Sequence, residues 1–142
     1  VLDGLQDPGN VGTILRSADA FGCDGVLLIN HCADPLNPKA VRATMGAIFR
    51  TPIWEVPAGA LCPLLEGSGL KLAATALGRN TVSLPDADLS RTALVIGGVS
   101  PDLLRQCAAT VRIPMEPTCE SLNAAAAAAV VLWELYRRDL TC

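Results

Sequence analysis

Three short segments of the sequence carry the side chains that could hold a ligand or do chemistry. They contain, in chain order, Asn10 and Arg16, then Lys39, Arg42 and Arg50, and finally Ser121 and Asn123. Amide and hydroxyl groups at the start of a helix join free backbone N–H groups, and together these groups bind polar ligands. Arginine adds directed hydrogen bonds to phosphate that lysine cannot copy. These residue types therefore favour a bound polyanion or sugar.

Each segment also fits a purely structural role. Asn10 could cap a helix, and Asn123 could cap the long helix that begins with the alanines at 124–129. Lys39 and Arg42 are three residues apart, so they share one side of a helix that could simply face solvent. Spacing alone leaves both interpretations open for every segment.

Length and composition describe one globular domain. The chain has 142 residues, of which 51% are hydrophobic and 18% charged, so it has enough apolar material to bury a core. Its net charge of −3 argues against a protein whose whole surface binds nucleic acid, because phosphate binding needs concentrated lysine and arginine. A local basic patch is still allowed, and Lys39, Arg42 and Arg50, here called the basic cluster, form one.

The cysteines and the apolar segments argue against several other classes of protein. The six cysteines are widely spread without a CxxC pair, and only one histidine could complete a metal site, so we predict no metal. We interpret the cysteines as small buried hydrophobic residues in a reducing cytoplasm. The apolar run at 124–133 is shorter than a membrane span, which needs about 20 residues, so we predict no membrane partner.

Strands and helices are predicted to alternate along the chain. Short apolar segments predict strands at 1–5, 26–29, 51–56, 70–77, 94–96 and 111–113. Apolar periodicity and helix-start signals predict helices at 11–21, 39–49, 61–65, 101–109 and from the alanines to Arg138, with a plain connection at 78–91. This order predicts an α/β fold with a mostly parallel sheet covered by helices on both faces. Ligands of such folds bind beyond the carboxyl ends of the strands.

Four segments resemble one known family in their order and spacing. They read DPGNVGTILRSADAFG, KAVRATMGAIF, ALVIG and IPMEPTCESLNAAAAAA, and the resemblance covers essentially the whole chain. The sequence is similar to the SpoU/TrmH family of RNA ribose 2'-O-methyltransferases, in the SPOUT class. The resemblance implies S-adenosylmethionine as cofactor, an rRNA or tRNA substrate and a C-terminal trefoil knot in the α/β fold. It also implies a homodimer whose two active sites draw on both subunits.

The resemblance further implies a role for each matched residue. Asn10 and Arg16 match the first motif, near the acceptor ribose, and Ser121 and Asn123 match the polar pair of the last motif. The implied cofactor-binding residues are Ala76, Leu77, Gly97, Ile113, Met115 and Leu122. The basic cluster is then the RNA-binding patch.

The middle motif departs from the family pattern. The family has a polar residue and a Glu after the first glycine, whereas here Gly97 is followed directly by Gly98, Val99 and Ser100. About four residues, including the Glu, are therefore absent. Either the protein has lost this Glu, or the sequence as written joins the two sides of a mobile loop. We favour the second interpretation because both flanks of the motif are intact.

Ribose methylation is an in-line displacement in which the 2'-oxygen attacks the sulfonium methyl group of the cofactor. The protein mainly aligns the reactants and removes the hydroxyl proton. A guanidinium stays protonated, so we expect Arg16 to orient phosphate and ribose while phosphate or water takes the hydroxyl proton. We expect residues 1–142 to form a catalytic domain, with a separate N-terminal substrate-binding domain that contributes RNA affinity.

Two other functions compete with this interpretation. One is a catalytically degenerate RNA-binding module of the same fold, which the missing Glu favours and the intact last motif opposes. The other is a small-molecule-binding α/β domain, such as a nucleotide binder. The alanines predict a long helix that packs closely in a knot or against a second subunit, so Ala125→Leu should disturb folding or dimerisation more than a surface substitution such as Arg138→Leu.

Overall fold

The computed structural model describes residues 1–78 and 80–140, and its centre is a parallel sheet. Seven strands follow one another across it in the order β3-β2-β1-β6-β4-β7-β5, and every pair of neighbours is parallel. The strands are β1 Leu2–Asp3, β2 Val26–Ile29, β3 Ile53–Glu55, β4 Lys71–Thr75, β5 Val82–Ser83, β6 Thr92–Gly97 and β7 Ala109–Arg112. The predicted parallel α/β sheet is confirmed.

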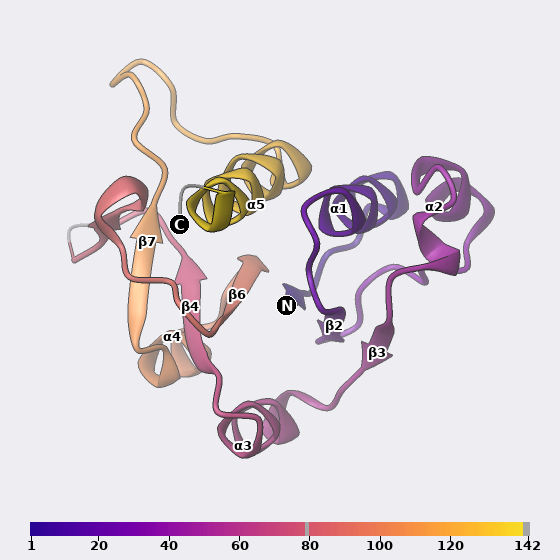
Figure 1. Cartoon of the computed structure of the whole chain (residues 1–142), viewed down its shortest axis with the longest axis horizontal. Helices are drawn as coiled ribbons and strands as arrows, with labels where there is room; N and C mark the ends of the chain where they lie inside the picture. Colours follow the sequence, from indigo (N-terminus) through magenta and orange to yellow (C-terminus); the bar gives the residue numbers. More distant parts are fainter. Residues whose placement is uncertain (79, 141–142) are drawn as a thin grey trace.

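Helices cover both faces of the sheet (Figure 1). One face carries α1 Pro8–Ala20 and α5 Ala124–Leu140, and the other carries α3 Ala58–Gly67 and α4 Pro101–Gln106. The short helix α2 Pro38–Ala43 packs against α1. Two 3₁₀ turns, η1 Ala47–Phe49 and η2 Leu84–Asp86, complete the fold.

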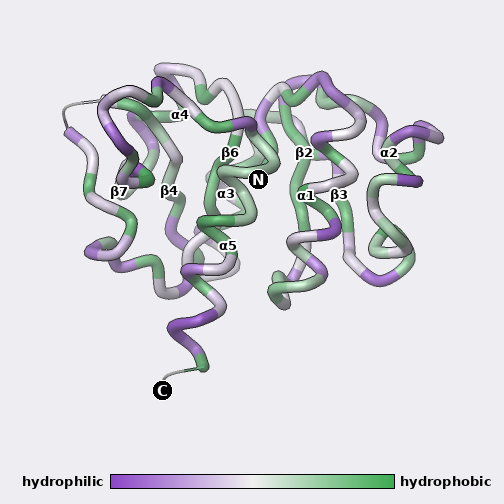
Figure 2. Tube along the Cα trace, turned by 90° about the horizontal axis from the view of Figure 1, so that it is seen from above, coloured by the Kyte–Doolittle hydropathy of each residue, from purple (hydrophilic) through white to green (hydrophobic). Residues whose placement is uncertain are grey.

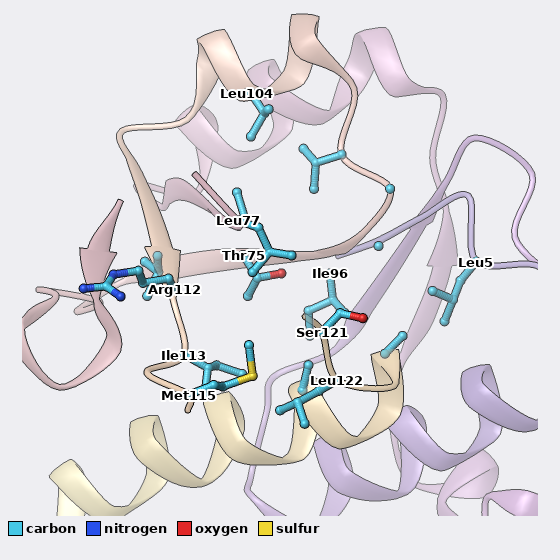
Figure 3. A pocket seen from close by; sticks show the side chains of 17 residues that line it. Leu5, Thr75, Leu77, Ile96, Leu104, Arg112, Ile113, Met115, Ser121 and Leu122 are labelled. Atoms are coloured by element: carbon cyan, nitrogen blue, oxygen red, sulfur yellow. The ribbon is translucent and has the colours of Figure 1, made fainter. Parts of the chain in front are cut away.

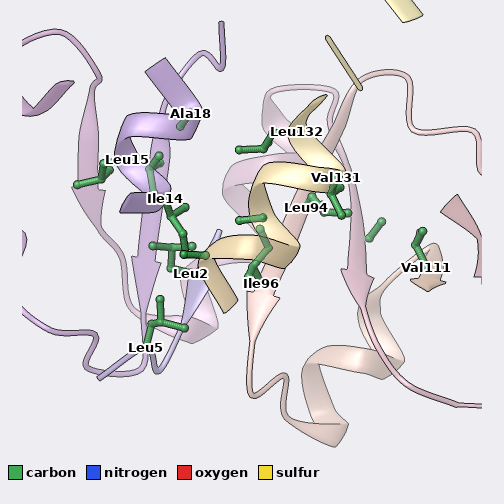
Figure 4. Packing of buried hydrophobic residues seen from close by; sticks show 14 of the residues in the cluster. Leu2, Leu5, Ile14, Leu15, Ala18, Leu94, Ile96, Val111, Val131 and Leu132 are labelled. Carbon is green, nitrogen blue, oxygen red and sulfur yellow. The ribbon is translucent and has the colours of Figure 1, made fainter. Parts of the chain in front are cut away.

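Each covered face has its own apolar core. Leu2, Leu15 and Val131 belong to the larger core, which lies between the sheet and the helices α1 and α5 (Figure 4). Leu61 and Val95 belong to the second core, on the side of α3 and α4. Figure 2 shows the same division along the chain, with apolar residues in the strands and hydrophilic residues in the outer turns and near the end of α5. The sheet is therefore buried on both sides, which holds its strand ends in fixed positions.

Four predicted elements differ clearly from the structure. The helix predicted at 101–109 ends at Gln106, and Ala109 already belongs to β7. Helix α1 begins at Pro8 because the Asp7 carboxylate caps it, so Asn10 lies inside the helix rather than in a turn before it. The predicted helix 39–49 is broken, since Met45 and Gly46 have φ angles of 49° and 88°. Arg42 and Arg50 therefore do not lie on one helix. The connection predicted at 78–91 contains β5 and η2.

Helix α5 packs closely through its alanines against the core of its own chain, but Arg138 is not the surface residue that the sequence suggested. Ala125 and Ala128 are 6% and 0% exposed and belong to the larger core. Arg138 is half-buried rather than a free surface residue. Its guanidinium donates hydrogen bonds to the carbonyl oxygens of Ala87 at 2.6 Å and Leu84 at 2.7 Å, and to the buried carboxylate of Glu134 at 3.0 Å. Arg138 therefore joins α5 to the segment after β5.

Arg138→Met should lower the free energy of unfolding by about 2–4 kcal/mol, because it leaves half-buried oxygen acceptors without donors. Urea denaturation at neutral pH measures this loss. Arg137→Met is the matched control: Arg137 is exposed and bonds Glu134, which lowers the pKa of that carboxyl group. The control should lose less than about 1 kcal/mol. Equal losses would show that the carbonyl contacts of Arg138 contribute nothing.

Candidate active site

A cavity of about 550 Å³ opens at the carboxyl ends of β4, β6 and β7 (Figure 3). Its volume lies in the range of small-molecule sites, and its position is the one where parallel sheets bind ligands. The residues predicted to bind the cofactor all line it: Ala76, Leu77, Gly97, Ile113, Met115 and Leu122. The structure thus brings residues from four separate segments around one space.

The cavity walls are mostly apolar. Leu104 of α4 lies on one side and the first turns of α5 lie on the other, while the segment after β7 brings Met115 and Leu122 across the opening (Figure 3). Thr75 is one of the few polar side chains in the lining, and its hydroxyl donates to the carbonyl oxygen of Val95 at 3.1 Å. Such walls suit a flat apolar ring system whose polar edges bond to the backbone.

Two amides meet near the cavity although they are 113 residues apart in the chain. The Asn123 amide nitrogen donates to the Asn10 side-chain oxygen at 3.2 Å. The Asn123 side-chain oxygen accepts from the backbone nitrogens of Ala125 at 2.9 Å and Ala126 at 3.3 Å, so Asn123 also caps α5. Neither asparagine lines the cavity, whereas Ser121, two residues before Asn123, does. The capping and ligand interpretations of this segment are thus compatible.

The structure places Arg16 away from this group. It is exposed on α1 and is absent from the cavity lining, and it lies six residues, or about 9 Å along the helix axis, beyond Asn10. The predicted catalytic residues therefore fall into two parts within one chain. Asn10, Ser121 and Asn123 lie beside the cavity, and Arg16 lies on the outer surface of α1.

The basic cluster is partly paired with acidic side chains. Two nitrogens of Arg50 donate to one carboxylate oxygen of Asp19, at 3.0 and 2.6 Å, and this hydrogen bonding raises the pKa of Arg50. Lys39 lies 3.8 Å from the carboxylate of Asp7. Arg42 is exposed and makes no ion pair with the described residues. Of the three cations, Arg42 is the one most available to a ligand.

Comparison with known proteins decides the family. The model of the SpoU rRNA Methylase family matches residues 1–133. The chain belongs to the SpoU rRNA methylase family. It is 40% identical over 98% of its length to an uncharacterised tRNA/rRNA methyltransferase of Synechocystis, covering 53% of that protein. It is 35% identical over 95% of its length to the 23S rRNA (guanosine(2553)-2'-O)-methyltransferase RlmP of Bacillus subtilis, covering 56% of it.

A solved structure agrees with this assignment to the SpoU family. The AdoMet-bound rRNA methyltransferase of Sinorhizobium meliloti superposes with a TM-score of 0.91 at 36% identity. The match covers 98% of this chain and 55% of that one. The chain thus spans a little more than half the length of each of these three relatives.

The middle SpoU motif is short in this chain. The backbone runs directly from Gly97 through Gly98 to Val99, whose N–H group donates to the Gly97 carbonyl oxygen at 3.0 Å. The interpretation that the sequence as written joins the two sides of a loop stays a prediction. Among the described residues that line the cavity none is acidic, and Arg112 directs its guanidinium away from Ser121 (Figure 3). The family Glu has no acidic replacement in the lining.

Asn123→Ala should lower the free energy of unfolding by about 1 kcal/mol, because α5 loses its cap. Asn123→Asp should restore that stability, since a carboxylate also caps a helix, but it cannot donate a hydrogen bond to Asn10. Urea denaturation and methyl-transfer assays of both variants separate the two roles. If Asn123→Asp is as active as the wild type, the bond to Asn10 does not contribute to activity.

Sequence reasoning missed several lining residues and misjudged the cysteines. Thr75 and Val99 line the cavity, and both could have been found because each lies at or beyond the carboxyl end of a strand. Cys119 is exposed rather than buried, and Cys142 lies outside the described residues. The other cysteines are half-buried, and burial raises the thiol pKa of three of them: Cys23, Cys32 and Cys107.

Two searches of the described residues concern metals and membranes. Residues 1–78 and 80–140 contain no group of three or more His, Cys, Asp or Glu side chains placed to hold a metal ion. None of the helices in this part of the chain combines the length and apolarity that a membrane crossing requires.

Proposed function

We propose that the chain is the catalytic domain of an S-adenosylmethionine-dependent methyltransferase that modifies a ribose 2'-hydroxyl in rRNA or tRNA. The observation that carries the proposal is the cavity, because all six residues predicted to bind the cofactor line it. The relatives support it, since one is named as a 2'-O-methyltransferase of rRNA and another was solved with AdoMet bound.

Each predicted site residue would have a separate role in binding or alignment. S-adenosylmethionine supplies an activated methyl group. The apolar walls around Ile113, Met115 and Leu122 fit its adenosine part, and backbone groups of these residues would provide hydrogen bonds. Ser121, Asn123 and Asn10 hold the acceptor ribose beside the cavity, and Arg16 orients its phosphate. Their alignment supplies most of the rate enhancement, because the methyl group needs no further activation.

Calorimetry and mass spectrometry test the proposal together. Titration of the chain with S-adenosylmethionine should give one site per chain, and Met115→Glu should weaken it by placing an acidic group in an apolar wall. A mass-spectrometric scan of rRNA and tRNA from a deletion strain should show one missing ribose methyl group. If the chain binds S-adenosylmethionine but the deletion strain lacks no ribose methyl group, the RNA-binding module remains as the function. If the chain does not bind S-adenosylmethionine, the proposal is contradicted.

We propose that two chains form a homodimer that completes each active site. An exposed apolar stripe runs along α5 through Ala126, Val130 and Trp133, and Phe21 and Tyr136 pack at its edge with ring centroids 5.9 Å apart. Within one chain, Arg16 does not line the cavity. A second copy that covers this stripe could bring its own Arg16 to the cavity of the first copy. Sedimentation of wild type and Trp133→Glu tests this, since the charge should favour the monomer.

We also infer that the C-terminal part of the chain is threaded as a trefoil knot. Strand β7 lies between β4 and β5, which precede it in the chain, and Arg138 of α5 bonds the carbonyl groups of Leu84 and Ala87. This interleaving supports threading of segment 113–140 past segment 76–91. Pulling a single chain from both ends tests it, because a tightened knot leaves the extended chain shorter than its contour length.

RNA capture would depend partly on a further substrate-binding domain. The net charge of −3 supports this proposal, because a single acidic domain attracts phosphate weakly. The composition can bury a core without disulfides, which supports a reducing compartment that we take to be the cytoplasm. If the 142-residue chain alone methylated RNA as efficiently as a longer protein that includes such a domain, the proposed contribution would be absent.

A further inference from the structure

We propose that Arg42, Met45 and Phe49, here called the α2–η1 ridge, bind an unpaired base and its phosphate in the single-stranded part of the RNA substrate. The inference rests on the proposed function, since it names the part of the RNA that the chain contacts outside the cavity. The inference adds the aromatic ring of Phe49 to the basic cluster. Residue spacing alone had identified that cluster only as a group of cations.

The ridge exposes two large apolar side chains. Phe49 is 86% exposed, the largest value among the exposed large hydrophobic residues of the described chain, and Met45 is 68% exposed. Scattered exposed hydrophobic residues need no explanation, but two within five positions of one turn form a patch. An aromatic face presented to solvent is suited to stacking on a base.

The backbone holds Phe49 outward. Ala47 is fully buried and Ile48 packs against the larger core, so the two preceding residues anchor the turn while Phe49 faces solvent. The two hydrogen bonds from Arg50 to Asp19 tie the next residue to α1. The platform is therefore already formed in the free protein, and binding a base would cost little conformational entropy.

The charges around the ridge favour RNA over a second protein copy. Lys39 and Arg50 are paired with Asp7 and Asp19 at the two ends of α1. The nearby cations that make no ion pair with the described residues are Arg16 and Arg42, and both are exposed. Two copies that met through this surface would bring like charges together, whereas RNA would bring phosphates. The apolar stripe on α5 is the surface better suited to a second copy.

A short single-stranded RNA with 2-aminopurine tests the ridge, because stacking on an aromatic ring quenches the fluorescence of this base. Phe49→Ala should weaken binding by about 5- to 100-fold and abolish the quenching, and Phe49→Trp should retain both. Arg42→Gln should instead reduce the slope of log K against log salt by about 1, measured between about 50 and 200 mM. Leu64→Ala, on α3 at the opposite face of the sheet and 46% exposed, is the control and should change nothing.

The possible results distinguish this inference from the proposed function. Calorimetry with S-adenosylmethionine should show that Phe49→Ala binds the cofactor like the wild type, which excludes general damage. If the wild type binds RNA and Phe49→Ala binds it equally well, the proposed role of the ridge is wrong and the methyltransferase proposal stands. A change in sedimentation on Phe49→Ala, without loss of RNA affinity per chain, would assign the ridge to a second copy. A wild type that binds no RNA would overturn the ridge proposal, whereas the methyltransferase proposal would be overturned by a wild type that binds no S-adenosylmethionine.

Discussion

Arg16→Ala is expected to lower kcat for methyl transfer by about 100- to 1000-fold while the affinity for S-adenosylmethionine stays nearly unchanged. Arg16 is exposed on α1 and does not line the cavity, so its removal leaves the cofactor walls intact. Its expected task is to orient the phosphate and ribose of the acceptor, and loss of such alignment slows the chemical step. Single-turnover methylation and calorimetry measure the two effects separately.

Arg105→Ala is the control for this result. Arg105 is also exposed and pairs with Asp102 on α4, away from α1. Its removal should change neither rate nor cofactor affinity. Loss of cofactor binding in Arg16→Ala would place this side chain on the cofactor side of the site, and full activity would remove it from the mechanism.

Mixing two inactive variants shows which subunit supplies Arg16. If the homodimer completes each site with the partner's Arg16, a mixture of Arg16→Ala and Ser121→Ala chains should recover roughly a quarter of wild-type activity, because half of the dimers would hold one intact site. No recovery is expected if both residues act within one chain. Recovery thus supports a shared site, and its absence contradicts one.

Gly97→Ala is expected to lower the free energy of unfolding by about 2–5 kcal/mol and to abolish cofactor binding. Gly97 has a φ of 130°, which side-chain-bearing residues rarely adopt. An added Cβ would also collide with the carbonyl oxygen of Asp3 in the neighbouring strand β1. The central strands cannot separate without opening both cores, so the collision would displace the end of β6 that lines the cavity.

Gly98→Ala is the matched control, one residue along the same connection. No atom lies within 4 Å of the Cβ position at Gly98, and its φ lies outside the left-handed range. This variant should be as stable as the wild type. Because Gly98 also lines the cavity, it is the control for stability and not for cofactor affinity. Urea denaturation of both variants and calorimetry of Gly97→Ala check the prediction. If Gly97→Ala proved as stable as Gly98→Ala, the close approach of β1 and β6 would not require a glycine.

Local sequence patterns predicted the main elements well and their ends less well. The parallel sheet followed from short apolar runs, because strands buried on both faces need apolar residues at every position. The start of α1 was missed because DPGN was taken for a turn, although Asp7 followed by a proline is also a capping signal. Strand β5 has two residues and no apolar run, so periodicity could not reveal it.

Long-range contacts explain the larger errors. Arg138 was taken for a surface residue because its carbonyl partners lie 51 to 54 residues earlier in the chain. The break at Met45 and Gly46 interrupts a regular apolar pattern, and it lets Ala47 and Ile48 reach the core. In both cases tertiary packing overrode a local preference.

The sequence by itself determined the fold class, the small side chains that let α5 pack closely, and the motif residues that belong to the SpoU family. Only the tertiary structure decided how those residues group. Asn10 and Arg16 lie on one helix about 240° apart around its axis, and the packing of α5 beside α1 gives Asn10 its partner Asn123 while Arg16 faces outward. Periodicity reports which face of an element is buried, whereas the distance between two elements depends on side chains far apart in the chain.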